Sequence, residues 1–415
     1  MPEGNIRVSV VSKPFIISAV VFVFAGSIIG SLWMMSLVGA DLSLALGSYR
    51  LHKTFQIDGF LTLLVMGVGY MIVPRLRNVQ LASIWLAYLS FILVVVSIAS
   101  SILSVFVDDA FLPLLSVFAE LFGISIFAGM MVWTIRIQPR LLRRADYFIA
   151  CSVFTLVAVN LFQIVVQVVG KNGNPLSEVQ MFLLFAILMI FGVEYKTLPS
   201  VLGFIRPRKK LSAVSFWLAL ASIILGVSSM LNDDLLLAES FNILLLGFIV
   251  TFAAAVHIFG GFDNSEILRL IQGEKKARYT YLVRHLRIAF LFLCSGIVLA
   301  FAFNFSNIYI LYDLAIHYTA IGFLGITVAL YLPLMLPPIT GKMIHFTKFS
   351  SLPLLLVVLA LAIRTFGDIF MTMRLSVTPA SYLLMISGWL IVVALIVFVR
   401  MIHESMKHVE IIDKL

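Results

Sequence analysis

The stretch YRLHKTFQIDGFLTLLVMGVGYMIVPRLRN, residues 49–78, holds the features that decide the fold. It is apolar over more than the roughly 20 residues that a helix rising about 1.5 Å per residue needs to cross a bilayer. Yet it carries His52 near its start and Asp58 one and a half turns later, and it closes on Pro74 and two arginines. Ionisable side chains are costly in hydrocarbon and usually mark function. The stretch therefore predicts a membrane-spanning helix with a functional polar face.

The rest of the chain has the same apolar character. Of its 415 residues, 62% are hydrophobic and only 12% are charged, whereas soluble domains have about 45–50% and about 25%. We predict an all-α polytopic membrane protein, a single transmembrane domain over residues 1–415 in contact with lipid, whose first span is retained and not cleaved as a signal peptide. The expected twelve spans are 14–39, 53–74, 80–107, 111–136, 146–170, 179–199, 211–231, 236–260, 280–304, 311–336, 351–373 and 379–402.

The positive charge of the chain, +9 in all, is concentrated in alternate turns. Basic residues gather at 75–77, 136–144 and 206–210, while intervening turns such as VDDAF (107–111) are acidic or neutral. By the positive-inside rule, this alternation predicts a multi-pass protein of the plasma membrane with both termini in the cytoplasm. It also argues against nucleic acid as the partner that the charge serves.

Three spans close with a similar proline-containing segment. These segments are GVGYMIVPRL (67–76), GVEYKTLPSVLGF (192–204) and LYLPLMLPPITG (330–341), and their prolines at 74, 199 and 337 lie 125 and 138 residues apart. The spacing predicts three repeats of four helices, over about 1–140, 141–275 and 276–415. The alternative is that proline simply ends a membrane helix before a basic turn.

Two histidines occupy similar places in two of these repeats. His52 lies 22 residues before Pro74 and His317 lies 20 residues before Pro337, so both are expected near the outer ends of their helices. The middle repeat has only Glu178 and Gln180 nearby. Two neutral imidazoles from different helices can hold a haem iron axially, bind a metal ion or form a proton path. We favour one b-type haem, because a twelve-helix bundle offers a wide apolar slot; the alternative is two hydrogen-bonded packing residues.

A haem near the outer face requires cations for its propionates, and arginine pairs well with carboxylates. The candidates are Arg364, Arg374 and Arg50. Arg364 has Asp368 one turn away, so an ion pair between these two residues is an equally good interpretation as a propionate contact. For Arg374, the alternative is an anchor at the membrane interface.

Further ionisable residues are candidates for a proton path or for holding the imidazoles. Asp58, Glu120 and Asp313 add carboxyl groups, and Asp313, four residues before His317, is well placed to accept a hydrogen bond from its ring. His257, near the inner end of the eighth span, is a weak candidate for a second metal site. Copper binding at His257 is possible, but no second ligand in the sequence supports it.

A second helix that starts with a histidine and ends in a GxGxxxxP pattern resembles helix II of the catalytic subunit of haem-copper oxidases. Members of that superfamily have twelve helices in three four-helix arcs, and one histidine on helix II and one on helix X hold their low-spin haem. The resemblance implies these ligand roles for His52 and His317, and propionate-binding roles for Arg364 or Arg374. The stretch IHYTAIGFLGITVALYLPLMLPPITGK (316–342) also looks like NnrS-type proteins, which are associated with haem and the response to nitric oxide.

The chain departs from the oxidases at the oxygen-reducing centre. Its sixth and seventh spans contain no histidine, and the residues two positions from His317 are Ala315 and Thr319. We therefore expect a divergent member that is not a complete terminal oxidase by itself. It would serve electron transfer, or a structural role in a respiratory or oxidising complex, with a copper protein, cytochrome or quinol as external donor and other subunits as neighbours. The alternatives are a nitric-oxide-response haem protein and a cofactor-free secondary transporter.

Overall fold

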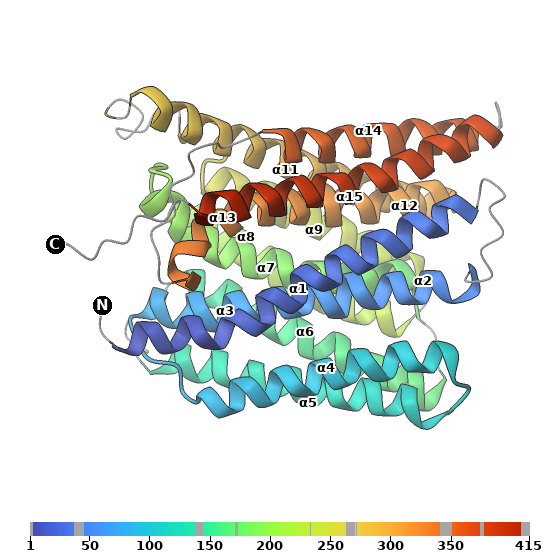
Figure 1. Cartoon of the computed structure of the whole chain (residues 1–415), viewed down its shortest axis with the longest axis horizontal. Helices are drawn as coiled ribbons and strands as arrows, with labels where there is room; N and C mark the ends of the chain where they lie inside the picture. The colour runs from blue at the N-terminus through green and yellow to red at the C-terminus, as the bar shows by residue number, and fades with distance from the viewer. Residues whose placement is uncertain are drawn as a thin grey trace. The chain divides into compact units, whose positions relative to one another are not determined.

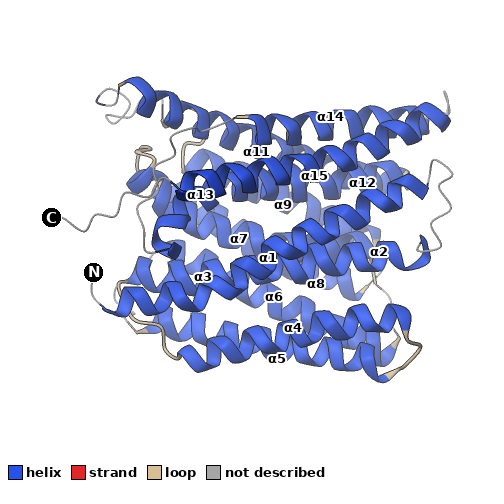
Figure 2. Cartoon of the chain, viewed as in Figure 1, coloured by secondary structure: helices blue, strands red, loops and turns tan. Residues whose placement is uncertain are grey.

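A computed structural model of the chain describes residues 3–36, 45–137, 144–170, 173–232, 234–262, 270, 272–340, 351–373 and 377–407. Within these ranges every regular element is a helix (Figure 2). Twelve helices are long and apolar enough to cross a membrane. The predicted all-α polytopic membrane protein is confirmed, while the grouping of its spans into three repeats stays a prediction.

The chain divides into two compact units. Unit 1 comprises Met1–Met71, Val105–Val107 and Gly325–Leu415, and unit 2 comprises Ile72–Ser104 and Asp108–Leu324. The spans that carry the two candidate histidines each pass from one unit into the other. His52 itself belongs to unit 1 and His317 to unit 2.

Small residues shape the packing of unit 1. Its helix α1 packs along η1 and α15, and α14 packs along α15 (Figure 1). Gly388 of α15 lies so close to Ser31 of α1 that an added Cβ would come within 2.9 Å of the serine Oγ; small residues allow such close approach of membrane helices. The elements of unit 1 are α1 (Glu3–Ser36), α2 (Ala45–Lys53), η1 (Thr54–Thr62), the first part of α3 (Leu63–Arg77), α13 (Ile326–Thr340), α14 (Leu352–Thr372) and α15 (Val377–Lys407).

Stacked phenylalanines fill the core of unit 2. Phe191 stacks on Phe252 with ring centroids 3.8 Å apart and on Phe290 at 5.5 Å, and Phe323 meets Phe290 edge-on at 5.4 Å. The rings come from α7, α9, α11 and η3, so they join helices distant in sequence. The elements of unit 2 are most of α4 (Ile84–Phe106), α5 (Phe111–Arg136), α6 (Arg144–Val169), α7 (Pro175–Val201), α8 (Lys209–Leu231), α9 (Leu235–Ala255), α11 (Gly273–Ser306), α12 (Tyr309–His317) and η3 (Tyr318–Gly325).

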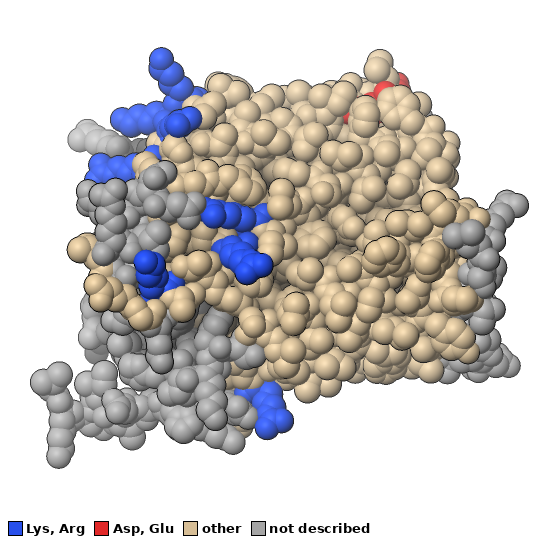
Figure 3. Space-filling view, turned by 90° about the horizontal axis from the view of Figure 1, so that it is seen from above, with Lys and Arg blue, Asp and Glu red and all other residues tan. Residues whose placement is uncertain are grey.

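Large apolar side chains cover much of the outer surface. Trp85, Trp133 and Trp217 are 84%, 64% and 63% exposed. Among the residues that Figure 3 describes, most of the face drawn carries no charged side chain. Such a surface is unfavourable in water and suits contact with lipid.

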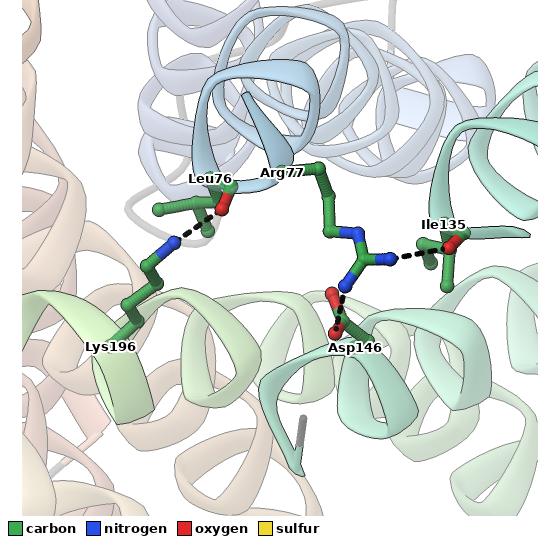
Figure 4. A network of polar contacts seen from close by, with 5 residues as sticks. All are labelled: Leu76, Arg77, Ile135, Asp146 and Lys196. Atoms are coloured by element: carbon green, nitrogen blue, oxygen red, sulfur yellow. Dashed lines mark hydrogen bonds and ion pairs between the residues drawn. The ribbon is translucent and has the colours of Figure 1, made fainter. Parts of the chain in front are cut away.

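A buried ion pair holds the end of α3 to its neighbours in unit 2 (Figure 4). Arg77 donates to the Asp146 carboxylate at 3.1 Å and to the Ile135 carbonyl at 2.9 Å, with only 4% and 6% of the two charged side chains exposed. Asp146 lies in the first turn of α6, where the helix dipole favours a negative charge. Lys196 of α7 donates to the Leu76 carbonyl. The PRLR segment that ends this span therefore fastens α3 to α5, α6 and α7.

Candidate functional site

The spans that carry His52 and His317 are each interrupted by a π-helical segment. In the first, η1 begins two residues after His52, and in the second, η3 begins directly after His317. No other π-helix occurs in the part of the chain that the structure describes. Long π-helical segments are rare, and π-helical turns are found frequently at functional sites. The two histidines that the sequence singles out thus share an unusual backbone setting.

The His52 ring lies directly on the backbone of α1. Its Nδ1 is 2.8 Å from the carbonyl oxygen of Gly26, and a Cβ added at Gly30 would come within 2.7 Å of the ring atoms Cε1 and Nδ1. Because a carbonyl only accepts hydrogen bonds, Nδ1 carries the proton in the neutral ring and Nε2 carries the lone pair. This is the tautomer in which Nε2 can bind a metal.

His317 adopts the same tautomer through contacts within its own helix. Its Nδ1 is 2.8 Å from the Asp313 carbonyl oxygen and 3.3 Å from the Asp313 carboxylate oxygen Oδ1. His285 also bonds the carbonyl one turn back, at 2.9 Å from Tyr281, so that contact alone does not distinguish a ligand. What distinguishes His317 is the added carboxylate and the π-helical segment that follows it.

The packing beside the two histidines is nearly the same in the two units. A Cβ added at Gly59 of η1 would lie 2.6 Å from Cγ of Phe22, and one added at Gly322 of η3 would lie 2.6 Å from Cγ of Phe292. Both glycines open a GFL triplet and stand 15 residues before the proline near the end of their span. Both phenylalanines begin an FxxxG pattern. These likenesses are local, and the relation between the first and third repeats stays a prediction.

The arginines proposed for propionates have different surroundings. Arg364 and Asp368 are both buried on α14, 9% and 5% exposed, one turn apart. Arg50 is exposed on α2. Arg374 lies outside the described residues. Of the two candidate arginines that the structure describes, Arg364 is the one buried inside a span, as a propionate partner in the bilayer requires.

The remaining candidates are spread over both units. Asp58 is half-buried on η1, and Glu120 is buried on α5. His257 follows the end of α9 with a left-handed backbone, φ 59°. Burial lowers the pKa of His257, and the charge of Arg208 lowers it further. Among the described residues, no cluster of three or more His, Cys, Asp or Glu side chains could hold a metal ion by itself.

Sequence reasoning missed the glycines that lie against the imidazole and its helix. Gly26 and Gly30 form a GxxxG pattern in α1, which is a known sign of close helix packing in membranes. It also missed the hydrogen bonds by which α7 joins three neighbours: Gln163 to Glu178 at 2.7 Å, Gln180 to Asn242 at 2.6 Å, and Ser177 to Ser229 at 2.7 Å.

Comparison of the chain with models of known protein families and with curated proteins finds no match. The function is therefore inferred from the geometry of the chain itself.

Proposed function

We propose that the chain is an integral membrane haem b protein in which His52 and His317 are the two axial ligands of one iron. The observation that carries the proposal is that the two imidazoles have the same backbone setting and the same hydrogen bond. Each lies beside a π-helical segment within a membrane span, and each has its Nδ1 at 2.8 Å from a backbone carbonyl. These hydrogen bonds orient each ring through Nδ1, so Nε2 would be the coordinating atom if an iron is bound, as in protein metal sites generally.

The residues present fit a low-spin haem. Two neutral imidazoles would suit a haem iron, the Asp313 carboxylate at 3.3 Å from Nδ1 of His317 would help to hold that ring in place, and the buried Arg364 would supply a cation for a propionate. Such a group, when bound, supplies a one-electron redox centre. Two protein ligands leave no position for substrate on the iron. Electron transfer, or a structural role in a respiratory or oxidising complex, is therefore favoured over catalysis of oxygen reduction. On the sequence resemblance, the proposal makes the chain a divergent relative of the oxidase catalytic subunit.

The charge pattern sets the proposed orientation. If the basic turns and both termini lie on the cytoplasmic side of the plasma membrane, both histidines lie in the outer half of their spans. An electron donor would then approach from outside, as a small copper protein, a cytochrome or a membrane quinol, and other membrane subunits are expected neighbours.

The deciding experiment is an absorption spectrum of the purified protein with a haem assay. We expect one haem per chain with a sharp reduced band of a bis-imidazole centre, lost in His52→Ala and in His317→Ala. His285→Ala is the matched control, because its ring makes the same Nδ1 contact with a carbonyl one turn back, and it should keep the band. Protein that binds no haem after expression with excess haem would refute the proposal. A band shifted by added nitric oxide would favour a nitric-oxide-handling protein.

A secondary transporter is the second candidate, and a specific observation favours it. The hydroxyls of Thr62, at the end of η1, and Thr327, just after η3, are fully buried and have no hydrogen-bond partner among the described residues. Interrupted helices with polar groups near the middle of the membrane are typical of transporter binding sites. Colourless protein that exchanges a labelled solute in vesicles would support this candidate.

A further inference from the structure

We infer that Gly30 is a positioning residue for His52: the absence of a side chain at position 30 allows the imidazole to lie on α1 with Nδ1 at the Gly26 carbonyl, so that Nε2 would be the atom that meets the iron. The inference rests on the proposed function and adds the element that sets the geometry of one axial ligand. Its basis is steric, and it is independent of which electron donor the protein uses.

The contact leaves no room for any other residue at position 30. An alanine Cβ would lie 2.7 Å from both Cε1 and Nδ1 of His52, well inside van der Waals contact. The opposing atoms belong to a ring held by a hydrogen bond of 2.8 Å to Gly26, so the ring cannot move without losing that bond. A side chain at position 30 would therefore force the imidazole off the α1 backbone and turn Nε2 away.

The neighbouring contacts keep this part of α1 in place. Gln56, one turn after His52, donates from Nε2 to the Ser27 hydroxyl at 3.2 Å and fastens η1 to α1. Ser31, one turn after Ser27, donates to the Ser27 carbonyl at 2.8 Å and packs against Gly388 of α15. Because α1 packs against both η1 and α15, we expect the imidazole, and not the helix, to move.

The third predicted repeat supplies a contrast. A Cβ added at Gly296 of α11 would meet the Thr319 Oγ1 at 2.6 Å and not the histidine, and position 300, which follows Phe292 as Gly30 follows Phe22, is an alanine. The His317 ring takes its hydrogen bond from within its own helix. Crowding at Gly296 should therefore disturb packing while leaving the ligand atom of His317 in place.

The test compares Gly30→Ala with Gly296→Ala and with Gly129→Ala, where a Cβ would meet nothing within 4 Å. We expect Gly30→Ala to bind haem about ten- to a hundredfold more weakly, the usual effect of disturbing the surroundings of a metal ligand, and to show a high-spin spectrum. The other two variants should keep the low-spin spectrum. A low-spin spectrum of unchanged intensity in Gly30→Ala would overturn the inference, whereas a wild-type protein without haem would overturn the proposed function.

A double variant covers the case in which Gly30→Ala does not fold. Because the overlap is with the imidazole, Gly30→Ala combined with His52→Ala should accumulate and melt like His52→Ala alone. If the double variant is as unstable as Gly30→Ala, the glycine packs against something other than the ring and the inference is wrong.

Discussion

Removing one member of the Arg77–Asp146 pair should destabilise the protein far more than removing both. The two charges are 3.1 Å apart and almost fully buried. Asp146→Leu leaves the guanidinium with its 2.9 Å bond to the Ile135 carbonyl but without this counter-charge. Arg77→Met leaves the carboxylate buried without its arginine.

The size of the effect follows from the geometry. At 3.1 Å and an effective dielectric constant of about 20, two unit charges attract by about 5 kcal/mol. Desolvation offsets much of this attraction in the intact pair, but a lone buried charge keeps the desolvation cost. Each single substitution should therefore cost about 3–5 kcal/mol, and the double variant Arg77→Met with Asp146→Leu should cost much less than the sum.

The assay is the free energy of unfolding in mixed micelles, measured by circular dichroism as the fraction of denaturing detergent is raised. The exposed Arg136, at the end of α5, provides the control, because Arg136→Met should change stability by no more than about 0.5 kcal/mol. Single variants within 1 kcal/mol of wild type, or costs that add in the double variant, would refute the assignment of a strongly coupled buried pair.

Two further predictions concern packing and pH. Gly59→Ala and Gly322→Ala should each lower the free energy of unfolding by about 1–3 kcal/mol, since an added Cβ would lie 2.6 Å from Cγ of Phe22 or Phe292. Replacing the facing phenylalanine by leucine should restore part of the lost stability. If the same unfolding assay shows no restoration, the glycines do not pack against these rings. The pKa of His257 is lowered by burial and a nearby arginine, so protonation favours the unfolded chain: stability should be full above the ordinary histidine pKa of about 6.5 and fall as the pH drops below it. His257→Asn, which tolerates the left-handed backbone, should flatten that fall, and equal slopes between pH 5 and 7.5 would contradict the prediction.

The sequence predicts the spans well because membrane insertion depends on simple quantities. Length and hydropathy are local, and each apolar run forms its backbone hydrogen bonds internally. The run around residues 53–74 is accordingly found as a span at Tyr49–Arg77. The two candidate histidines could be singled out for a similar reason, since an imidazole in such a run is conspicuous against its neighbours.

The contacts of those histidines were not predictable in the same way. The approach of His52 to Gly30 depends on how α1 and α2 pack, and glycine gives no periodic signal that names its partner. The π-helical segments were not predicted either, because η1 and η3, of nine and eight residues, are too short for a change of helical period to show in the pattern of apolar residues. Asp146 is conspicuous in the sequence as a lone carboxylate at the start of an apolar run. Its partner could not be predicted, because Arg77 lies 69 residues away.

The span that carries His52 keeps to the same neighbouring helix through its π-helical segment. An α-helix places successive residues 100° apart, so a face that is apolar over six turns directs few of its positions toward one ligand. A π-helical segment widens the helix and shifts the residues before it relative to those after it. Here Gly59, within the segment, lies against Phe22, and His52, seven residues earlier, lies on Gly30 of the same neighbouring helix. The span of residues 49–77 thus contacts α1 both at the segment and at the histidine, so the proposed ligand role of His52 depends on how closely these two helices pack.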